Sequence, residues 1–153
     1  MFENVKMPEG MNPEVLEHLM APKNYGKLDD ASGVGIGVDE KTGEYVIFYL
    51  KTAGDIIEDV RFATNGCQDT VVVGSMFTQM IKGENIEHGK KAIAKMELKL
   101  GGLTPKQRVC TDMVLEAFVA SLINREHLLR GEKEEVHIIK MKESCEETED
   151  GNE

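Results

Sequence analysis

Hydrophobic and polar positions follow two different periods along this chain. Residues 33–38 alternate glycine with β-branched residues, residues 45–50 are almost continuously apolar, and residues 56–62 alternate imperfectly between apolar and polar side chains. Such short segments predict three strands, and the short turns between them predict an antiparallel meander. The alternating glycines also indicate a strand that another backbone approaches closely.

Apolar positions at helical spacing predict four helices, each with a boundary signal at one end. Asn12–Pro13 and Thr104–Pro105 each place a capping residue before a proline, the usual order at a helix start. The predicted helices run from Asn12 to before Pro22, from Asp69 to Ile81, from Asn85 to Leu100 and from Pro105 to about Leu129. The segment Val136–Met141 is interpreted as a further short strand.

The length and the composition predict one domain between two looser ends. The 153 residues contain 41% apolar residues, enough for one hydrophobic core. We expect a flexible arm at residues 1–11, a domain at 12–130 and a C-terminal extension at 131–153 that ends in an acidic, disordered tail. That tail carries six acidic residues and no basic one after position 142: Glu143, Glu146, Glu147, Glu149, Asp150 and Glu153.

Charge and hydropathy exclude several classes of partner. The net charge of −10 argues against nucleic acid, because binding a polyphosphate depends on clustered cations. No apolar run approaches the length of a membrane span, and the first residues lack the order of a signal peptide. We therefore expect a cytoplasmic protein that does not bind membranes. In that compartment its three cysteines stay reduced and are candidates for metal or sulfur chemistry.

Two of the cysteines lie near predicted helix starts. Asn65–Gly66 supplies a sharp turn after the third strand, and Cys67 follows it where unpaired N–H groups and the helix dipole favour a thiolate. Cys110 lies near the start of the last helix. A single cysteine of this kind is often an inert buried residue, but two in parallel positions favour a shared site. Cys145 is discounted, because it lies within the acidic tail.

Several short sequence words follow one another in order over residues 12–129. They include Asn24-Tyr25-Gly26-Lys27-Leu28, Thr64-Asn65-Gly66-Cys67, Gly101-Gly102-Leu103, and Cys110 followed by an apolar helix. This ordered set resembles the iron–sulfur cluster assembly scaffolds of the IscU/NifU N-terminal type. The resemblance implies an α+β fold, with a small antiparallel three-stranded sheet and helices packed on one face. This fold agrees with the strands and helices predicted from the periodicity.

The family pattern uses three cysteines and an aspartate as ligands, and this chain keeps only part of that set. Thr42-Gly43-Glu44 stands where the family has Cys-Gly-Asp, so the first cysteine is absent and the acid is one methylene longer. Cys67 and Cys110 match the second and third cysteines, while Val109 replaces the usual histidine or lysine partner. The resemblance thus implies Cys67 and Cys110 as ligands, with Glu44 either an oxygen ligand or a solvated turn residue.

The resemblance implies a scaffold rather than an enzyme. We expect it to accept sulfur as a persulfide on Cys67 or Cys110, to bind iron weakly and to pass on a [2Fe–2S] cluster, with zinc as an alternative metal. The implied partners are a cysteine desulfurase, apo iron–sulfur acceptor proteins and, for a shared cluster, a second copy in a homodimer. The alternative is a degenerate member that acts as a metal-free binding or regulatory module. A zinc hydrolase is disfavoured, because the four histidines lie in no ligand-spaced motif: His18, His88, His127 and His137.

Overall fold

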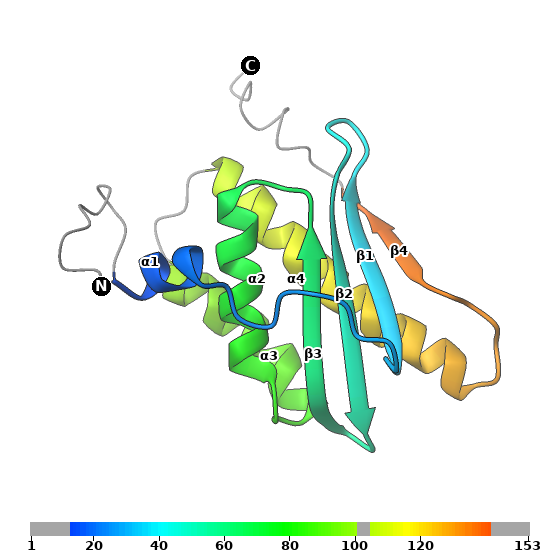
Figure 1. The fold of residues 1–153 in the computed structure, drawn as a ribbon. Helices are drawn as coiled ribbons and strands as arrows, with labels where there is room; N and C mark the ends of the chain where they lie inside the picture. Colours follow the sequence, from blue (N-terminus) through cyan, green and yellow to red (C-terminus); the bar gives the residue numbers. More distant parts are fainter. Residues whose placement is uncertain (1–12, 101–104, 142–153) are drawn as a thin grey trace.

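The computed structural model describes residues 13–100 and 105–141, which form one sheet covered by helices (Figure 1). The predicted arm at 1–11, the loop at 101–103 and the acidic tail with Cys145 lie outside the described residues. The elements are α1 (Pro13–Met20), β1 (Gly33–Asp39), β2 (Glu44–Ala53), β3 (Ile56–Thr64), α2 (Gln68–Ile81), α3 (Ile86–Leu100), α4 (Pro105–Leu129) and β4 (His137–Lys140).

The sheet has four strands in the order β3-β2-β1-β4. The predicted antiparallel meander of β1, β2 and β3 is confirmed, but β4 adds a parallel neighbour to β1, so the sheet is mixed rather than three-stranded and antiparallel. The path of α4 explains the fourth strand. This helix runs back along β1 from the Asp39 end to the Gly33 end, so the chain that leaves it returns in the direction of β1.

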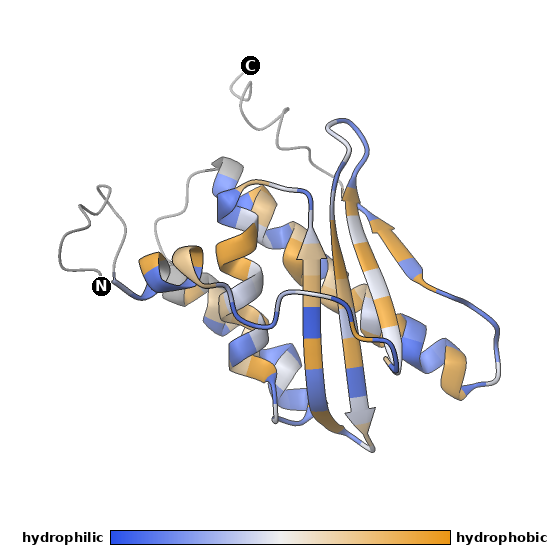
Figure 2. Ribbon diagram, viewed as in Figure 1, coloured by the Kyte–Doolittle hydropathy of each residue, from blue (hydrophilic) through white to orange (hydrophobic). Residues whose placement is uncertain are grey.

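The core lies between the sheet and the helices on one of its faces, as the sequence predicts. Val46, Phe48 and Leu50 of β2 are fully buried, and α4 packs on β1 and β2 while α2 packs on β3. Figure 2 shows hydrophilic and hydrophobic residues alternating along β3. The rings of Phe48, Phe77 and Phe118 meet with centroids 5.1–6.1 Å apart and join β2 to α2 and α4.

A β-bulge explains the imperfect alternation of the third strand. Lys51 pairs with Asp59 but the next residue of β2, Thr52, pairs with Ile57, so Glu58 is an extra residue in β3. The extra residue reverses the inward and outward faces, and Ile57 and Val60 both point into the core. The deviation from period two in the sequence was therefore the sign of the bulge.

The glycines of β1 let the backbone of α4 lie directly against the sheet. A Cβ at Gly37 would lie 2.6 Å from the carbonyl oxygen of Met113, and a Cβ at Gly33 would meet the carbonyl oxygen of Ser121. A side chain at either position would displace the helix. The close backbone approach predicted from alternating glycines is thus confirmed, and it fixes the distance between α4 and the sheet.

None of the helices in the described ranges is both long and apolar enough to cross a membrane.

The substitution Gly35→Ala tests this close packing. The new Cβ would meet the backbone nitrogen of Ser121 and lie 2.5 Å from the carbonyl oxygen of Ala117, and neither backbone atom has room to move. We expect the free energy of unfolding, measured by urea denaturation, to fall by about 3 kcal/mol, the upper end of the cost of overpacking. The control is Gly89→Ala, because its Cβ would meet only side-chain ends 3.1 and 3.3 Å away and alanine favours a helix. An equal loss for both variants would contradict this account of β1.

Candidate metal centre

Three strand ends and two helices meet at one end of the sheet. β1 ends at Asp39, which pairs with Glu44 at the start of β2, and the end of β3 at Thr64 pairs with Val46 two residues farther along β2. The loop after β3 leads directly into α2, and α4 begins at the same end because it runs antiparallel to β1. Side chains from distant parts of the sequence therefore converge here.

This convergence brings Cys67 and Cys110 together, with their Sγ atoms 3.8 Å apart. Neither forms a disulfide, because the distance is far longer than the S–S bond of about 2.05 Å. Two thiolates bound to one tetrahedral metal with bonds of about 2.3 Å are about 3.8 Å apart along the edge of the tetrahedron. The sulfur pair thus already has the spacing that a single zinc or iron ion requires.

The two cysteines differ in access to solvent. Cys67 is half-buried at the N-cap of α2, where its carbonyl oxygen accepts the N–H groups of Thr70 and Val71 at 3.1 and 3.2 Å. Cys110 is fully buried beside Val109. It is the sixth residue of α4, which begins at Pro105 as predicted, so Cys110 lies in the second turn of the helix. Solvent therefore reaches the pair at Cys67.

Asn65 and Thr64 fasten the loop before Cys67 to the β1–β2 turn. The side chain of Asn65 accepts the N–H of Tyr45 at 2.8 Å and donates to the carbonyl oxygen of Gly43 at 3.1 Å. The hydroxyl of Thr64 donates to the carbonyl oxygen of Tyr45 at 2.6 Å and accepts the N–H of Gly66 at 2.8 Å. These four bonds hold the 42–44 turn and the Cys67 loop as one unit.

The structure does not bring the carboxylate of Glu44 to the sulfur pair. Among the described residues, no carboxylate oxygen of Glu44 lies within 4.8 Å of both sulfurs. Its Oε1 is buried, and in the described part of the chain it has no hydrogen-bond partner. Thr42 acts as a turn residue, because its hydroxyl accepts the N–H of Glu44 at 3.2 Å. The position of the family's first cysteine is therefore part of the turn.

Two polar residues at this end were not singled out in the sequence analysis. Thr111 follows Cys110, is 1% exposed, and has a hydroxyl without a hydrogen-bond partner among the residues described. Asp39 is buried and accepts the N–H of Lys41 at 3.1 Å, which stabilises the turn after β1. The sequence could have indicated Asp39, because an aspartate at a strand end, four residues before Gly43, is typical of a turn. Nothing in the sequence distinguishes Thr111 from other threonines.

The histidines are less scattered than the sequence suggests. His18 is buried in α1 and lies 2.6 Å from the hydroxyl of Ser75, so it is a core contact between α1 and α2. His127 at the end of α4 and His137 at the start of β4 meet around the carboxylate of Glu134. The turn after α4 brings them together, and the spacing of ten residues between them belongs to no standard motif.

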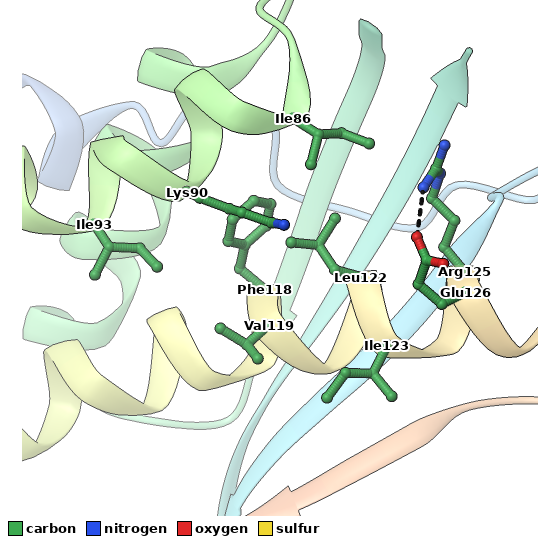
Figure 3. A pocket seen from close by; sticks show the side chains of 9 residues that line it. All are labelled: Ile86, Lys90, Ile93, Phe118, Val119, Leu122, Ile123, Arg125 and Glu126. Carbon is green, nitrogen blue, oxygen red and sulfur yellow. Dashed lines mark hydrogen bonds and ion pairs between the residues drawn. The ribbon is translucent and has the colours of Figure 1, made fainter. Parts of the chain in front are cut away.

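A separate pocket of about 390 Å³ lies between α3 and α4 (Figure 3). Ile93, Phe118 and Leu122 line it with apolar surface, and Lys90 and Arg125 bring positive charge to it. No cysteine or histidine lines it, so the pocket offers neither a thiolate nor an imidazole ligand to a metal. The candidate metal ligands among the described residues lie elsewhere, at the sulfur pair and around Glu134.

The fold and the sulfur pair define a small α+β domain that presents a dithiol at the end of its sheet. The family model described as NifU-like N terminal domain matches residues 11–127. The chain belongs to this family, as the resemblance in the sequence indicated.

Individual relatives agree with the family. The chain is 41% identical over 108 residues to "Iron-sulfur cluster assembly scaffold protein IscU" of Aquifex aeolicus, 69% of each chain. It is 36% identical over 73 residues to "Zinc-dependent sulfurtransferase SufU" of Bacillus subtilis, 48% of this chain and 49% of that protein. A crystal structure of a NifU-like protein (N-terminal) from Brucella abortus has the same fold, with a TM-score of 0.59 at 19% identity over 76% of this chain and 94% of that one.

The difference in burial predicts the order in which the two thiols react. In a Cys145→Ser background, we expect iodoacetamide to label Cys67 of the native protein first, because its side chain is partly open to solvent. Cys110 has no exposed surface and is labelled only after local opening. Peptide mass spectrometry over a time course measures both sites. Labelling of Cys110 as fast as Cys67 would contradict the buried position of Cys110.

The substitution Glu44→Ala tests the unpaired carboxylate oxygen. A buried acceptor without a partner costs about 1 kcal/mol or more, so its removal is expected to leave the metal-free protein equally stable or to stabilise it by about 1 kcal/mol. Urea denaturation measures the change. The control is Glu58→Ala at an exposed position of β3, expected within about 0.5 kcal/mol of the original. A clear destabilisation by Glu44→Ala would mean that this carboxylate has a structural partner.

Proposed function

We propose that this protein is an iron–sulfur cluster assembly scaffold that holds iron and sulfur at Cys67 and Cys110 and passes them to an acceptor. The observation that carries the proposal is the distance of 3.8 Å between the two sulfur atoms, which suits two ligands of one metal ion. Relatives named as cluster assembly scaffolds support the same function. Such a protein binds the cluster transiently and transfers it to an acceptor protein.

The sulfur pair supplies only part of a ligand set. A [2Fe–2S] cluster takes four protein ligands, and Cys67 and Cys110 provide two of them. Either Glu44 joins them and the monomer holds a labile metal, or the Cys67 and Cys110 pairs of two copies share one cluster in a homodimer. The first arrangement requires the Glu44 side chain to move toward the sulfurs, and one of its oxygens, buried near this end of the sheet, has no hydrogen-bond partner in the described chain to hold it in place.

Access assigns different roles to the two thiols. The half-buried Cys67 accepts sulfur from a cysteine desulfurase: its thiolate attacks the outer sulfur of the donor's persulfide, one S–S bond forms as another breaks, and the donor leaves as a thiolate. The buried Cys110 is held by α4 and serves as the fixed metal ligand. The assembled cluster then passes to apo iron–sulfur proteins.

Zinc is the second metal that this pair suits. Zinc takes the same tetrahedral geometry with thiolate ligands, and water fills an open position. The relative named as a zinc-dependent sulfurtransferase favours a variant of the function in which zinc stays bound while Cys67 exchanges sulfur. Metal analysis distinguishes the two, because cluster cargo brings iron and sulfide together.

A metal-free binding module is the alternative function, and the 42–44 turn favours it. The Thr42 hydroxyl, at the family's first ligand position, already accepts the N–H of Glu44, and no described carboxylate or histidine completes a compact group with the two sulfurs. A module of this kind docks with a cysteine desulfurase and retains that affinity when both Cys67 and Cys110 are replaced.

Anaerobic reconstitution with iron and sulfide tests the proposed function. We expect a coloured protein with bound iron and sulfide, and at least about a tenfold loss of bound iron in Cys67→Ser and in Cys110→Ser, since each removes half of the thiolate pair. Absorbance and elemental analysis measure the product. Cys145→Ser is the matched control, and it should retain the iron.

The outcome decides between the candidate functions. A colourless product without iron, from a folded protein that still binds a cysteine desulfurase, overturns the scaffold function and supports the metal-free module. One zinc ion per chain, lost together with Cys67 or Cys110, supports the zinc-dependent variant.

A further inference from the structure

His127, Glu134 and His137 form a second group of metal-ligand side chains, remote in the sequence from Cys67 and Cys110. One ligand atom from each lies within 4.8 Å of the other two, and in residues 13–100 and 105–141 no other three His, Cys, Asp or Glu side chains meet this closely. His127 Nδ1 lies 2.8 Å from Glu134 Oε1, and His137 Nδ1 lies 3.1 Å from Glu134 Oε2. The two imidazole rings meet edge to face, with centroids 5.4 Å apart.

These distances are close to those of a metal site. Ligands of a tetrahedral ion with bonds of about 2.0–2.1 Å are about 3.4 Å apart, so each Nδ1 needs to move only about half an ångström from its carboxylate oxygen. The proton of each Nδ1···O hydrogen bond would leave as the metal binds. Two imidazoles and one carboxylate are a donor set that suits Zn²⁺ or Fe²⁺, with positions left for water. The three side chains are 22%, 26% and 26% exposed, so an ion can enter from solvent.

A neighbouring amide holds the carboxylate in place. Asn124 is 1% exposed, and its Nδ2 donates to Glu134 Oε1 and to the carbonyl oxygen of Glu134, each at 3.0 Å. Its Oδ1 accepts the N–H of Val34 at 2.9 Å, which fixes the orientation of the amide. Hydrogen bonds from Asn124, His137 and His127 lower the pKa of Glu134 to about 2, so the carboxylate is ionised at neutral pH. Metal ligands are commonly oriented by such outer hydrogen bonds.

We propose that His127, Glu134 and His137 bind a divalent first-row transition-metal ion, such as Zn²⁺ or Fe²⁺, at a site separate from the cysteine pair. The proposal does not depend on the scaffold function, because no sulfur ligand takes part. The ion would join the end of α4, the connection after it and the start of β4.

The proposed ion would hold the start of β4 in place. This strand has four residues and pairs with the rest of the sheet on one side only, through β1. Its far end leads to Met141, whose N–H donates to the carbonyl oxygen of Val38 at 2.9 Å and whose side chain packs against Val109 and Cys110. A metal at the start of β4 would therefore stabilise the strand that leads to Met141, which packs beside the buried thiol.

Zinc binding to a full-length chain without cysteines tests the proposal. In the variant Cys67→Ser, Cys110→Ser and Cys145→Ser, isothermal titration calorimetry should show one Zn²⁺ per chain, with Fe²⁺ as a second, anaerobic arm. Addition of His137→Gln or His127→Gln should weaken binding at least about a hundredfold, since even a residue that only orients a ligand contributes about 10- to 100-fold. The matched control is His88→Gln on α3, whose Nδ1 lies 3.9 Å from a carboxylate oxygen of Glu84, and it should leave the affinity unchanged.

NMR of the imidazole rings locates the ion without relying on the folding of a histidine variant. In the cysteine-free chain, Zn²⁺ should shift the ring signals of His127 and His137 but not those of His88, and amide exchange of Ile138 and Ile139 in β4 should slow. The proposal is overturned if zinc does not saturate at one per chain, if His88→Gln weakens binding as much as His137→Gln, or if the ring signals of His127 and His137 stay in place.

Discussion

The close contact between the backbone of α4 and the glycine face of β1 is the constraint on which the rest of this structure depends. Because Gly33, Gly35 and Gly37 have no side chains, α4 lies on the sheet with its carbonyl groups nearly touching the strand. This packing fixes the position of α4 along β1. It carries Cys110 to the end of the sheet where Cys67 begins α2, and it carries His127 to the opposite end where β4 begins.

The sulfur pair shows how a rigid frame and an accessible atom are combined. Cys110 is enclosed by α4 and its neighbours, while Cys67 lies on a loop that Thr64 and Asn65 tie to the turn between β1 and β2. The frame brings the two sulfurs to the spacing of metal ligands, as preorganised binding sites do. The half-buried position of Cys67 still leaves one atom of the pair in reach of a partner.

Most of the fold could be predicted from the sequence, because local signals agree with the tertiary structure. Period-two segments, the Asn–Gly turn and the Pro13 and Pro105 helix starts each placed an element close to its observed bounds. The alternating glycines even predicted a backbone contact. The sequence indicates the fourth strand only weakly, since four residues carry little periodicity and its pairing with β1 depends on the path of α4.

The candidate sites were predictable only in part. Cys67 and Cys110 were indicated by their positions near helix starts and by the family pattern, but their distance depends on how α2 and α4 pack. The meeting of His127 with His137 was not indicated, because it depends on a turn and on strand pairing rather than on a ligand spacing within one element. The side-chain position of Glu44 follows from the hairpin geometry, which no local pattern specifies.

The complete burial of Cys110 limits how an ion or a protein can reach the sulfur pair. Among the described residues, the exposed part of the sulfur pair belongs to Cys67, because Cys110 has no exposed surface. Under the proposed function, a protein that delivers sulfur and a protein that collects the cluster would both need to reach Cys67. They would therefore bind in turn rather than together.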